Sequence, residues 1–191
     1  LRTQGASTSD FTRHHGGIES YNELGFNYRM TEMQAAIGVE QMKKLDTMLA
    51  RRRRLAARYD DRLADCPGVQ TPYGPQHTPH TYQSYCIRLD PTQTPPRDWV
   101  MARLQEQGIA TRRGMMAIHE EPYYAIRFGR ISLPITEATA RETLLLPLYA
   151  DMTDAEQERV IGALTSALRE GPRQVNPFGQ SRPFAQRGYR R

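Results

Sequence analysis

Apolar residues recur at spacings of three and four along residues 33–63, which is the pattern of an amphipathic helix. Thr31 and Gln34 have the spacing of a capping box at its start, and a Cys-Pro-Gly sequence would end it. The pattern predicts one long helix over residues 31–66, with a kink near Asp46. Because such a helix spans roughly 45 Å, we expect it to connect two domains or to form a dimer contact.

Shorter apolar patterns follow beyond residue 80 and alternate between the strand type and the helix type. Together they predict a small α/β domain of the α+β kind over residues 80–169, with helices on one side of a sheet. The predicted elements are a strand over Thr81–Leu89, a helix over Arg97–Gln107 that ends at Gly108, a strand over Ile109–Met116, a helix over Pro134–Thr143 and a strand over Leu144–Tyr149. A capping box of Thr153 and Glu156 opens the last helix, whose apolar face carries Val160, Ile161, Leu164 and Leu168.

Three further segments lack this periodicity. Residues 1–30 are irregular and rich in Gly, so we expect a loop that other parts of the protein hold in place. Residues 67–79 are rich in Pro, Thr, Gln and His, which predicts a linker. Residues 171–191 hold five Arg and no acid, so the charge of this segment equals the formal net charge of the whole chain, +5. We therefore expect a basic disordered tail over residues 170–191.

Composition limits the class of protein. The 191 residues are 38% hydrophobic, which is enough for one or two small domains. No window approaches the roughly 18 consecutive apolar residues of a membrane span, and no secretory signal is visible. The two cysteines, Cys66 and Cys86, cannot form a disulfide framework, so we expect both to be reduced in a cytoplasmic protein.

Motifs for several kinds of chemistry are absent from the sequence, which has no Gly-x-Gly-x-x-Gly, P-loop or Gly-x-Ser-x-Gly. His77 and His80 are three residues apart, but no Cys or carboxylate cluster joins them, so we expect no metal site. The basic run Arg51–Arg54 points in four directions on a helix. We therefore interpret it as a solvated helix face rather than a phosphate-binding patch.

Asn27 and Arg29 stand just before the start of the predicted long helix. An amide and a guanidinium at that place could bind a phosphate or a carboxylate, with Arg29 forking onto two oxygens. The alternative is local, with Asn27 forming a turn and Arg29 pairing with Glu32. The spacing alone leaves both open.

Several segments together resemble one known family. They are Leu1–Ala6, with Gln4 where the family usually has His, Gly25–Gly38 (GFNYRMTEMQAAIG), His80–Tyr85, Gly108–Tyr123 with its His-x-x-Pro, and Leu144–Tyr149 followed by Met152 and Thr153. In order and spacing they are similar to the DegT/DnrJ/EryC1/StrS sugar aminotransferases, which are fold-type-I enzymes that use pyridoxal 5'-phosphate. The resemblance extends from residue 1 to about residue 169.

The resemblance implies that this chain is the C-terminal half of such an enzyme. It would comprise the long interdomain helix and the small C-terminal domain, without the N-terminal large domain. The lysine that holds the cofactor as a Schiff base would precede Leu1, because Lys43 and Lys44 occupy other positions. We therefore expect no catalytic residue in this chain, and we expect the fragment alone to be inactive.

The family also implies a homodimer whose active sites lie at the subunit interface, where the loop of residues 1–30 reaches the cofactor of the partner. Carried over to this sequence, Asn27 and Arg29 would bind the cofactor phosphate, and Tyr21 is a weaker candidate. His119, in the His-x-x-Pro segment, would face the nucleotide-sugar substrate unless it is structural. His80 would lie near the same cleft unless it caps the strand.

The implied activity is transfer of an amino group, with glutamate as the suggested donor, to a nucleotide-linked keto-sugar. Such reactions serve polysaccharide, lipopolysaccharide or secondary-metabolite biosynthesis. Two alternatives stay open. A dehydratase relative would use the same cofactor with His in place of the Schiff-base Lys. A basic interaction protein would bind nucleic acid through Arg51–Arg54 and the tail, with an affinity that falls as salt rises.

Overall fold

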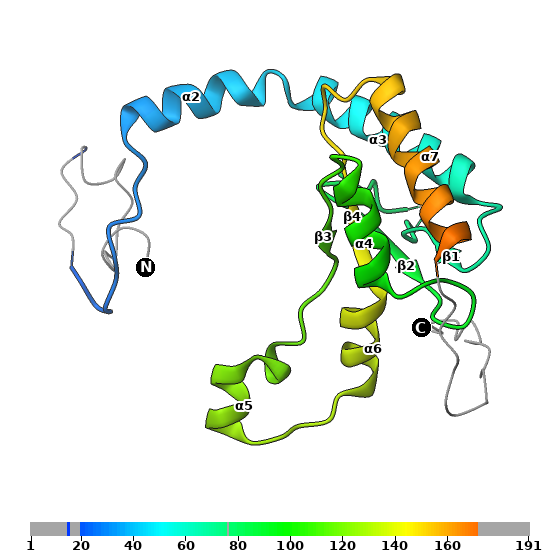
Figure 1. The fold of residues 1–191 in the computed structure, drawn as a ribbon. Helices are drawn as coiled ribbons and strands as arrows, with labels where there is room; N and C mark the ends of the chain where they lie inside the picture. The colour runs from blue at the N-terminus through cyan, green and yellow to red at the C-terminus, as the bar shows by residue number, and fades with distance from the viewer. Residues whose placement is uncertain (1–14, 16–19, 76, 172–191) are drawn as a thin grey trace. The chain divides into compact units, whose positions relative to one another are not determined.

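The computed structural model describes residue 15 and residues 20–75 and 77–171. Residues 172–191 of the basic tail predicted over residues 170–191, and residues 1–14 and 16–19 of the loop predicted over residues 1–30, lie outside this range. The chain divides into two compact units, residues 1–46 and residues 47–191, and each is described by itself (Figure 1). Within the described part, no helix has the length and apolar character needed to cross a bilayer.

The first unit consists of an irregular segment and helix α2, Glu32–Met42. Its predicted capping box is confirmed, because the Thr31 hydroxyl accepts from the Gln34 N–H at 3.3 Å and the Gln34 side chain accepts from the Thr31 N–H at 3.0 Å. The helix buries no residue, and Met33, Ile37 and Met42 are 64% to 78% exposed. The apolar positions that predicted a buried face are therefore uncovered in this unit.

The prediction of one continuous helix over residues 31–66 is wrong. Helix α2 ends at Met42, and helix α3, Leu45–Leu63, begins after a two-residue turn. At this turn the Lys44 N–H donates to the Gln41 carbonyl at 3.0 Å, an i→i−3 bond that interrupts the α-helical ladder. The predicted kink near Asp46 is thus an interruption a few residues earlier.

Helix α3 supplies one wall of the core of the second unit. Leu55, Ala56, Tyr59 and Leu63 are buried along one side of it. After Leu63 the chain turns back at Gly68, whose φ of 76° is a backbone conformation that favours glycine. The position also has no room for a side chain, because an added Cβ would lie 2.6 Å from the Thr94 Cγ2. The predicted end of the helix at the Cys-Pro-Gly sequence is confirmed.

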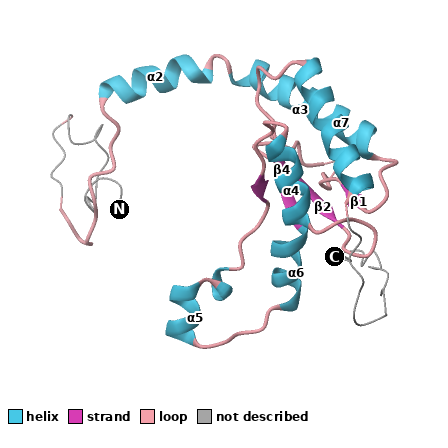
Figure 2. Cartoon of the chain, in the orientation of Figure 1, coloured by secondary structure: helices cyan, strands magenta, loops and turns pink. Residues whose placement is uncertain are grey.

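Four strands in the described part of the second unit form an antiparallel sheet in the order β1-β2-β4-β3 (Figure 2). Their bounds are β1 Val69–Gln70, β2 Tyr85–Leu89, β3 Arg112–Arg113 and β4 Thr143–Leu146. Strand β1 lies inside the segment predicted as a linker. The strand predicted over Ile109–Met116 is reduced to β3, and the one predicted over Thr81–Leu89 begins only at Tyr85, because Tyr82 has a φ of 47° that ends extended structure.

Helices α4 Arg97–Glu106 and α7 Asp154–Glu170 join α3 and this sheet to form the core. The short η1 Ile118–Glu120, α5 Pro122–Phe128 and α6 Pro134–Glu142 lie between β3 and β4 in the sequence and supply none of the described residues of its hydrophobic cluster. Burial alternates along β2, and its buried side chains join those of α3, α4 and α7 in one cluster. The predicted mixed helix and strand fold with a small sheet is confirmed.

Candidate functional site

Asn27 and Arg29 lie together in the irregular segment of the first unit. The Asn27 Oδ1 accepts from the Arg29 backbone N–H at 3.4 Å and from the Arg29 Nε at 3.3 Å. The first bond closes a turn of the kind Asn side chains form two residues ahead, as the local alternative predicted. The second bond orients the Arg29 guanidinium, and the binding of a phosphate by this pair stays a prediction.

This pair has the chemistry of an anion site. Both side chains are exposed, and together they carry amide N–H donors, guanidinium N–H donors and one positive charge. A phosphate prefers such donors, and the planar guanidinium can engage two of its oxygens. Tyr21 belongs to the same segment, is 56% exposed, and like Asn27 forms an isolated β-bridge.

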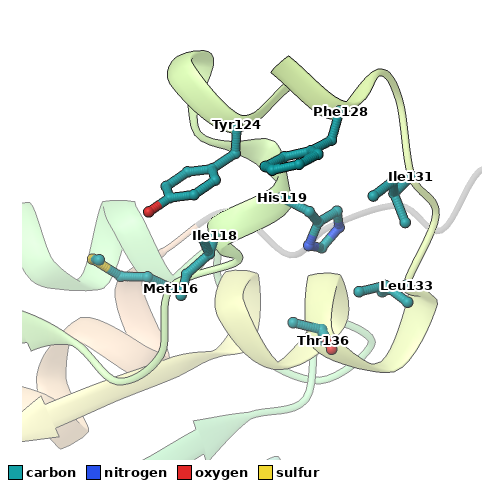
Figure 3. Close-up of a pocket in the computed structure, with 8 residues that line it drawn as sticks. All are labelled: Met116, Ile118, His119, Tyr124, Phe128, Ile131, Leu133 and Thr136. Atoms are coloured by element: carbon teal, nitrogen blue, oxygen red, sulfur yellow. The ribbon is translucent and has the colours of Figure 1, made fainter. Parts of the chain in front are cut away.

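His119 lies in the second unit, on the short helix η1 (Figure 3). Its side chain is only 10% exposed, and its Nε2 is 3.3 Å from the Glu137 Oε1. It lines an almost wholly apolar hollow of about 330 Å³ between η1, α5 and α6, and the other lining residues are Met116, Ile118, Tyr124, Phe128, Ile131, Leu133 and Thr136. The aromatic rings of Tyr124 and Phe128 stack at this site, with centroids 6.3 Å apart.

A second, more polar hollow of about 450 Å³ also contacts His119. Its lining includes Glu120, Arg130, Ser132 and Glu137, and it shares His119 and Ile131 with the apolar hollow. The imidazole therefore borders both an apolar and a polar surface. A sugar presents both apolar C–H faces and hydroxyl groups, so this surrounding suits a sugar better than a purely ionic ligand.

Charged groups surround His119 on its polar side. Arg141 lies 3.6 Å from the Glu137 Oε2 and 3.5 Å from the Glu120 Oε1. The Leu133 backbone N–H, first, and His119, second, hold the pKa of Glu137 below its usual value. His119, Glu120 and Glu137 could each offer one ligand atom to a metal within 4.8 Å of one another, but Arg141 already brings a positive charge to both carboxylates. We assign no metal to this cluster.

The sequence analysis missed Glu137 and Arg141 as neighbours of His119. They stand 18 and 22 residues further along the chain, with α5 and a loop between them. Only the tertiary fold brings helix α6 beside η1, so no local spacing predicts that Glu137 and Arg141 are neighbours of His119. The one local signal is that Glu137 lies in the first turn of the predicted helix, where an acid is expected for capping alone.

His80 has a different environment. Its Nδ1 accepts from the Tyr82 backbone N–H at 2.9 Å, and the two rings are tilted by 46° with centroids 4.4 Å apart. Its carbonyl oxygen accepts from the Arg53 Nε at 3.0 Å. These contacts fix the turn that precedes β2 and support the strand-capping alternative, while the substrate role of His80 stays a prediction.

The basic run Arg51–Arg54 is tied to the protein itself. The Arg52 Nη1 donates to the carbonyls of Tyr82 and Gln83 at 3.0 and 3.2 Å, and Arg51 pairs with Asp151 at 3.1 Å. Arg51, Arg53 and Arg54 are exposed, as a solvated helix face requires, whereas Arg52 is partly buried, and the donors of Arg52 and Arg53 bind α3 to the segment before β2. A nucleic-acid phosphate would have to displace these bonds.

Comparison with known proteins places these features in a family. The model of the DegT/DnrJ/EryC1/StrS aminotransferase family matches residues 1–165. The aminotransferase TlmJ from Streptoalloteichus hindustanus is 28% identical over 88% of this chain, with a TM-score of 0.71, and S. venezuelae DesV is 29% identical over 92%, with a TM-score of 0.72. Helicobacter pylori PseC is 20% identical and shares the fold, with a TM-score of 0.72 over 88% of this chain. The chain spans 43% of the length of TlmJ and of DesV and 44% of that of PseC.

Proposed function

Because this chain belongs to the DegT/DnrJ/EryC1/StrS aminotransferase family, we propose that it forms part of a sugar aminotransferase that uses pyridoxal 5'-phosphate. The observation that carries the proposal is the family match over residues 1–165, which includes both the Asn27–Arg29 pair and His119. The similarity to TlmJ, a protein described as an aminotransferase, supports the same reaction class.

In this proposal Asn27 and Arg29 hold the phosphate of the cofactor. When bound, the cofactor supplies an electron sink for the reaction. Their fit to that group rests on the donors they carry and on the bond from the Arg29 Nε to the Asn27 Oδ1, which orients the guanidinium. Tyr21, exposed in the same segment, is a third contact in the proposal. A homodimer would let this segment serve the active site of the partner.

The Schiff-base lysine belongs, in this proposal, to a part of the enzyme outside this chain. A lysine with that role needs a desolvated or cationic environment that lowers its pKa. Lys43 and Lys44 are both exposed, and Lys43 pairs with Glu40. Neither therefore has the environment that the role requires.

His119 is the proposed contact to the sugar, and glutamate is the proposed amino donor. The imidazole borders an apolar and a polar hollow, which matches the mixed surface of a sugar. His80 is a weaker candidate for the same role, because its Nδ1 is engaged by Tyr82. A dehydratase relative would share this half of the site, so the residue at the Schiff-base position decides between the two.

The test measures cofactor affinity in the full-length enzyme. Asn27→Ala should weaken binding of pyridoxal 5'-phosphate roughly tenfold to a hundredfold, because a hydrogen bond to a charged group contributes about 1.5–3 kcal/mol. Asn22→Ala is the matched control, since Asn22 lies in the same exposed segment and its Oδ1 is near Ser20. An equilibrium absorbance titration reports both.

Equal cofactor affinity in the Asn27→Ala and wild-type enzymes would contradict the assignment of this residue. Release of 2-oxoglutarate from glutamate by the wild-type enzyme would support amino transfer. A protein that binds the cofactor and dehydrates the sugar without consuming an amino donor would favour the dehydratase alternative.

A further inference from the structure

We propose that Glu137 is a positioning residue for His119, which it orients so that one chosen ring nitrogen is left to accept a hydrogen bond from the substrate. The inference rests on the proposed function, in which His119 contacts the sugar. It concerns the pair formed by the His119 Nε2 and the Glu137 Oε1, which are 3.3 Å apart (Figure 3 shows the position of His119).

Glu137 is itself held in place from two sides. Its Oε1 accepts from the Leu133 backbone N–H at 2.8 Å, and its Oε2 lies 3.6 Å from the Arg141 Nη2. The Glu137 side chain is 19% exposed and that of His119 is 10% exposed, so water has little access to either. A carboxylate anchored in this way can fix the rotation of an imidazole ring beside it.

The charge on Glu137 determines which tautomer of a neutral His119 is favoured. Three neighbours, Leu133, His119 and Arg141, favour the charged form of the carboxylate, and an ionised carboxylate can only accept hydrogen bonds. The proton of a neutral His119 must then lie on Nε2. The other nitrogen, Nδ1, is left as an acceptor, which suits a hydroxyl donor such as that of a sugar.

Other charged groups face the same ring. Glu120 follows His119 in η1 and pairs with Arg141, and Arg130 lines the polar hollow with them. Glu120 does not hydrogen-bond to His119 among the contacts of the described residues. It therefore offers a variant that removes one negative charge from the cluster and leaves the pair intact.

A purely structural role for Glu137 is the competing explanation. Its bond to the Leu133 N–H caps the start of α6, and a cap alone would stabilise the helix without affecting the imidazole. The tautomer of His119 separates the two roles, because Glu137→Ala removes the acceptor beside the imidazole, whereas the loss of a cap alone would leave the tautomer unchanged.

The experiment is nuclear magnetic resonance of the full-length protein labelled with ¹⁵N at histidine, with His119→Asn to assign the signal. In the wild type we expect His119 to be protonated at Nε2 when neutral. In Glu137→Ala we expect the neutral ring to populate both tautomers, because no carboxylate then accepts from Nε2. Glu120→Gln should leave the Nε2 tautomer in place, because Glu120 does not contact the ring nitrogen.

Two results would overturn the proposal. One is a wild-type His119 protonated at Nδ1 when neutral, which needs no variant to observe. The other is a Glu137→Ala protein, folded by its amide spectrum, whose neutral His119 has the same tautomer population as in the wild type.

Kinetics of the full-length enzyme test the link to the substrate. Glu137→Ala should raise KM for the keto-sugar about tenfold, the effect of about 1.4 kcal/mol of lost binding, with kcat little changed. A changed His119 tautomer with an unchanged KM would mean that Glu137 positions His119 but that His119 does not contact the sugar. That result would refute the proposed substrate role and leave the positioning role intact.

Discussion

Tyr85 and Tyr59 show, at the scale of single residues, how polar groups are satisfied inside the core. Their rings lie 4.8 Å apart, and both are buried. The Tyr85 hydroxyl donates to the Asp60 carboxylate at 2.5 Å, whereas the Tyr59 hydroxyl donates to the neutral Pro147 carbonyl at 2.9 Å. The two positions therefore allow a matched comparison of a charged and a neutral acceptor.

Tyr85→Phe should lower the free energy of unfolding by about 1.5–3 kcal/mol, and Tyr59→Phe by about 0.5–1.5 kcal/mol. The ring packing is retained in both variants. The difference between the two losses of free energy therefore reports the cost of leaving a charged or a neutral acceptor without its hydroxyl donor. Asp60 is partly buried, and burial raises its pKa, so a lost donor is costly there. Denaturant titrations measure both values, and equal losses would contradict this account.

The residues of the candidate site differ in how far the sequence predicts them. Asn27 and Arg29 are two positions apart, and their bond is local, so the spacing made a joint role one of the two interpretations that it left open. The contact between His119 and Glu137 spans 18 residues and depends on how α6 packs beside η1. Such a contact needs the tertiary fold, and pattern reasoning could not reach it.

Helix α7 illustrates the scale of whole elements. The capping box of Thr153 and Glu156 fixes its first turn, and six of its residues are buried. Thr153→Ala should lower the free energy of unfolding of the second unit by about 1 kcal/mol, the usual effect of a lost N-cap. Thr31→Ala removes the same box from α2, which buries no residue, and should leave that value unchanged. A similar loss in both variants, by denaturant titration, would refute the distinction.

An ion-pair ladder joins α7 to α3, which lie side by side in Figure 1. Glu158 accepts from Arg62 at 2.5 Å and from Arg58 at 2.9 Å, and the hydrogen bond from Arg62 is the main cause that lowers the pKa of Glu158 from its ordinary 4.5. A carboxyl whose pKa is lowered in the folded state stabilises the fold at pH values above its ordinary pKa. That contribution is lost as the pH falls through the folded-state pKa.

Thermal unfolding against pH tests this ladder. Wild-type protein should lose stability as the pH falls below about 4.5. Glu158→Gln should lose less over the same range, because the Gln side chain takes up no proton there. Glu106→Gln is the control, since Glu106 pairs with Arg103 inside one helix and joins no two elements. Identical pH profiles for Glu158→Gln and the wild type would show that the ladder does not couple to folding.

Local signals predicted the helices well and the strands less well. Both capping boxes, the positive φ of Gly108 after α4 and the chain reversal at Gly68 follow from residue types at fixed offsets. The two-residue strands β1 and β3 do not, because they exist only through pairing with β2 and β4. The interruption between α2 and α3 was predicted only as a kink near Asp46, because the apolar spacing continues across it.

At the scale of the whole molecule, the uncovered apolar residues are the feature that most needs explanation. In the first unit the large apolar side chains that are more than half exposed are Tyr21, Leu24, Phe26, Tyr28, Met30, Met33, Ile37, Val39 and Met42. So many exposed large apolar side chains in one short segment indicate a surface that a partner covers. The proposed homodimer would cover it, and helix α2 would then lie in the dimer contact.

Ile37→Lys in the full-length protein tests this proposal. Ile37 is 64% exposed and lies on α2, so the change should not disturb the fold of a subunit, but it should weaken association because it would bury a charge in the contact. Gln41→Lys adds the same charge to an exposed polar position of the same helix. Sedimentation velocity should show dissociation of the first variant at concentrations where the wild type and the second are dimers. If Ile37→Lys sediments as the wild type does, α2 lies outside the dimer contact, and another surface must cover these apolar residues.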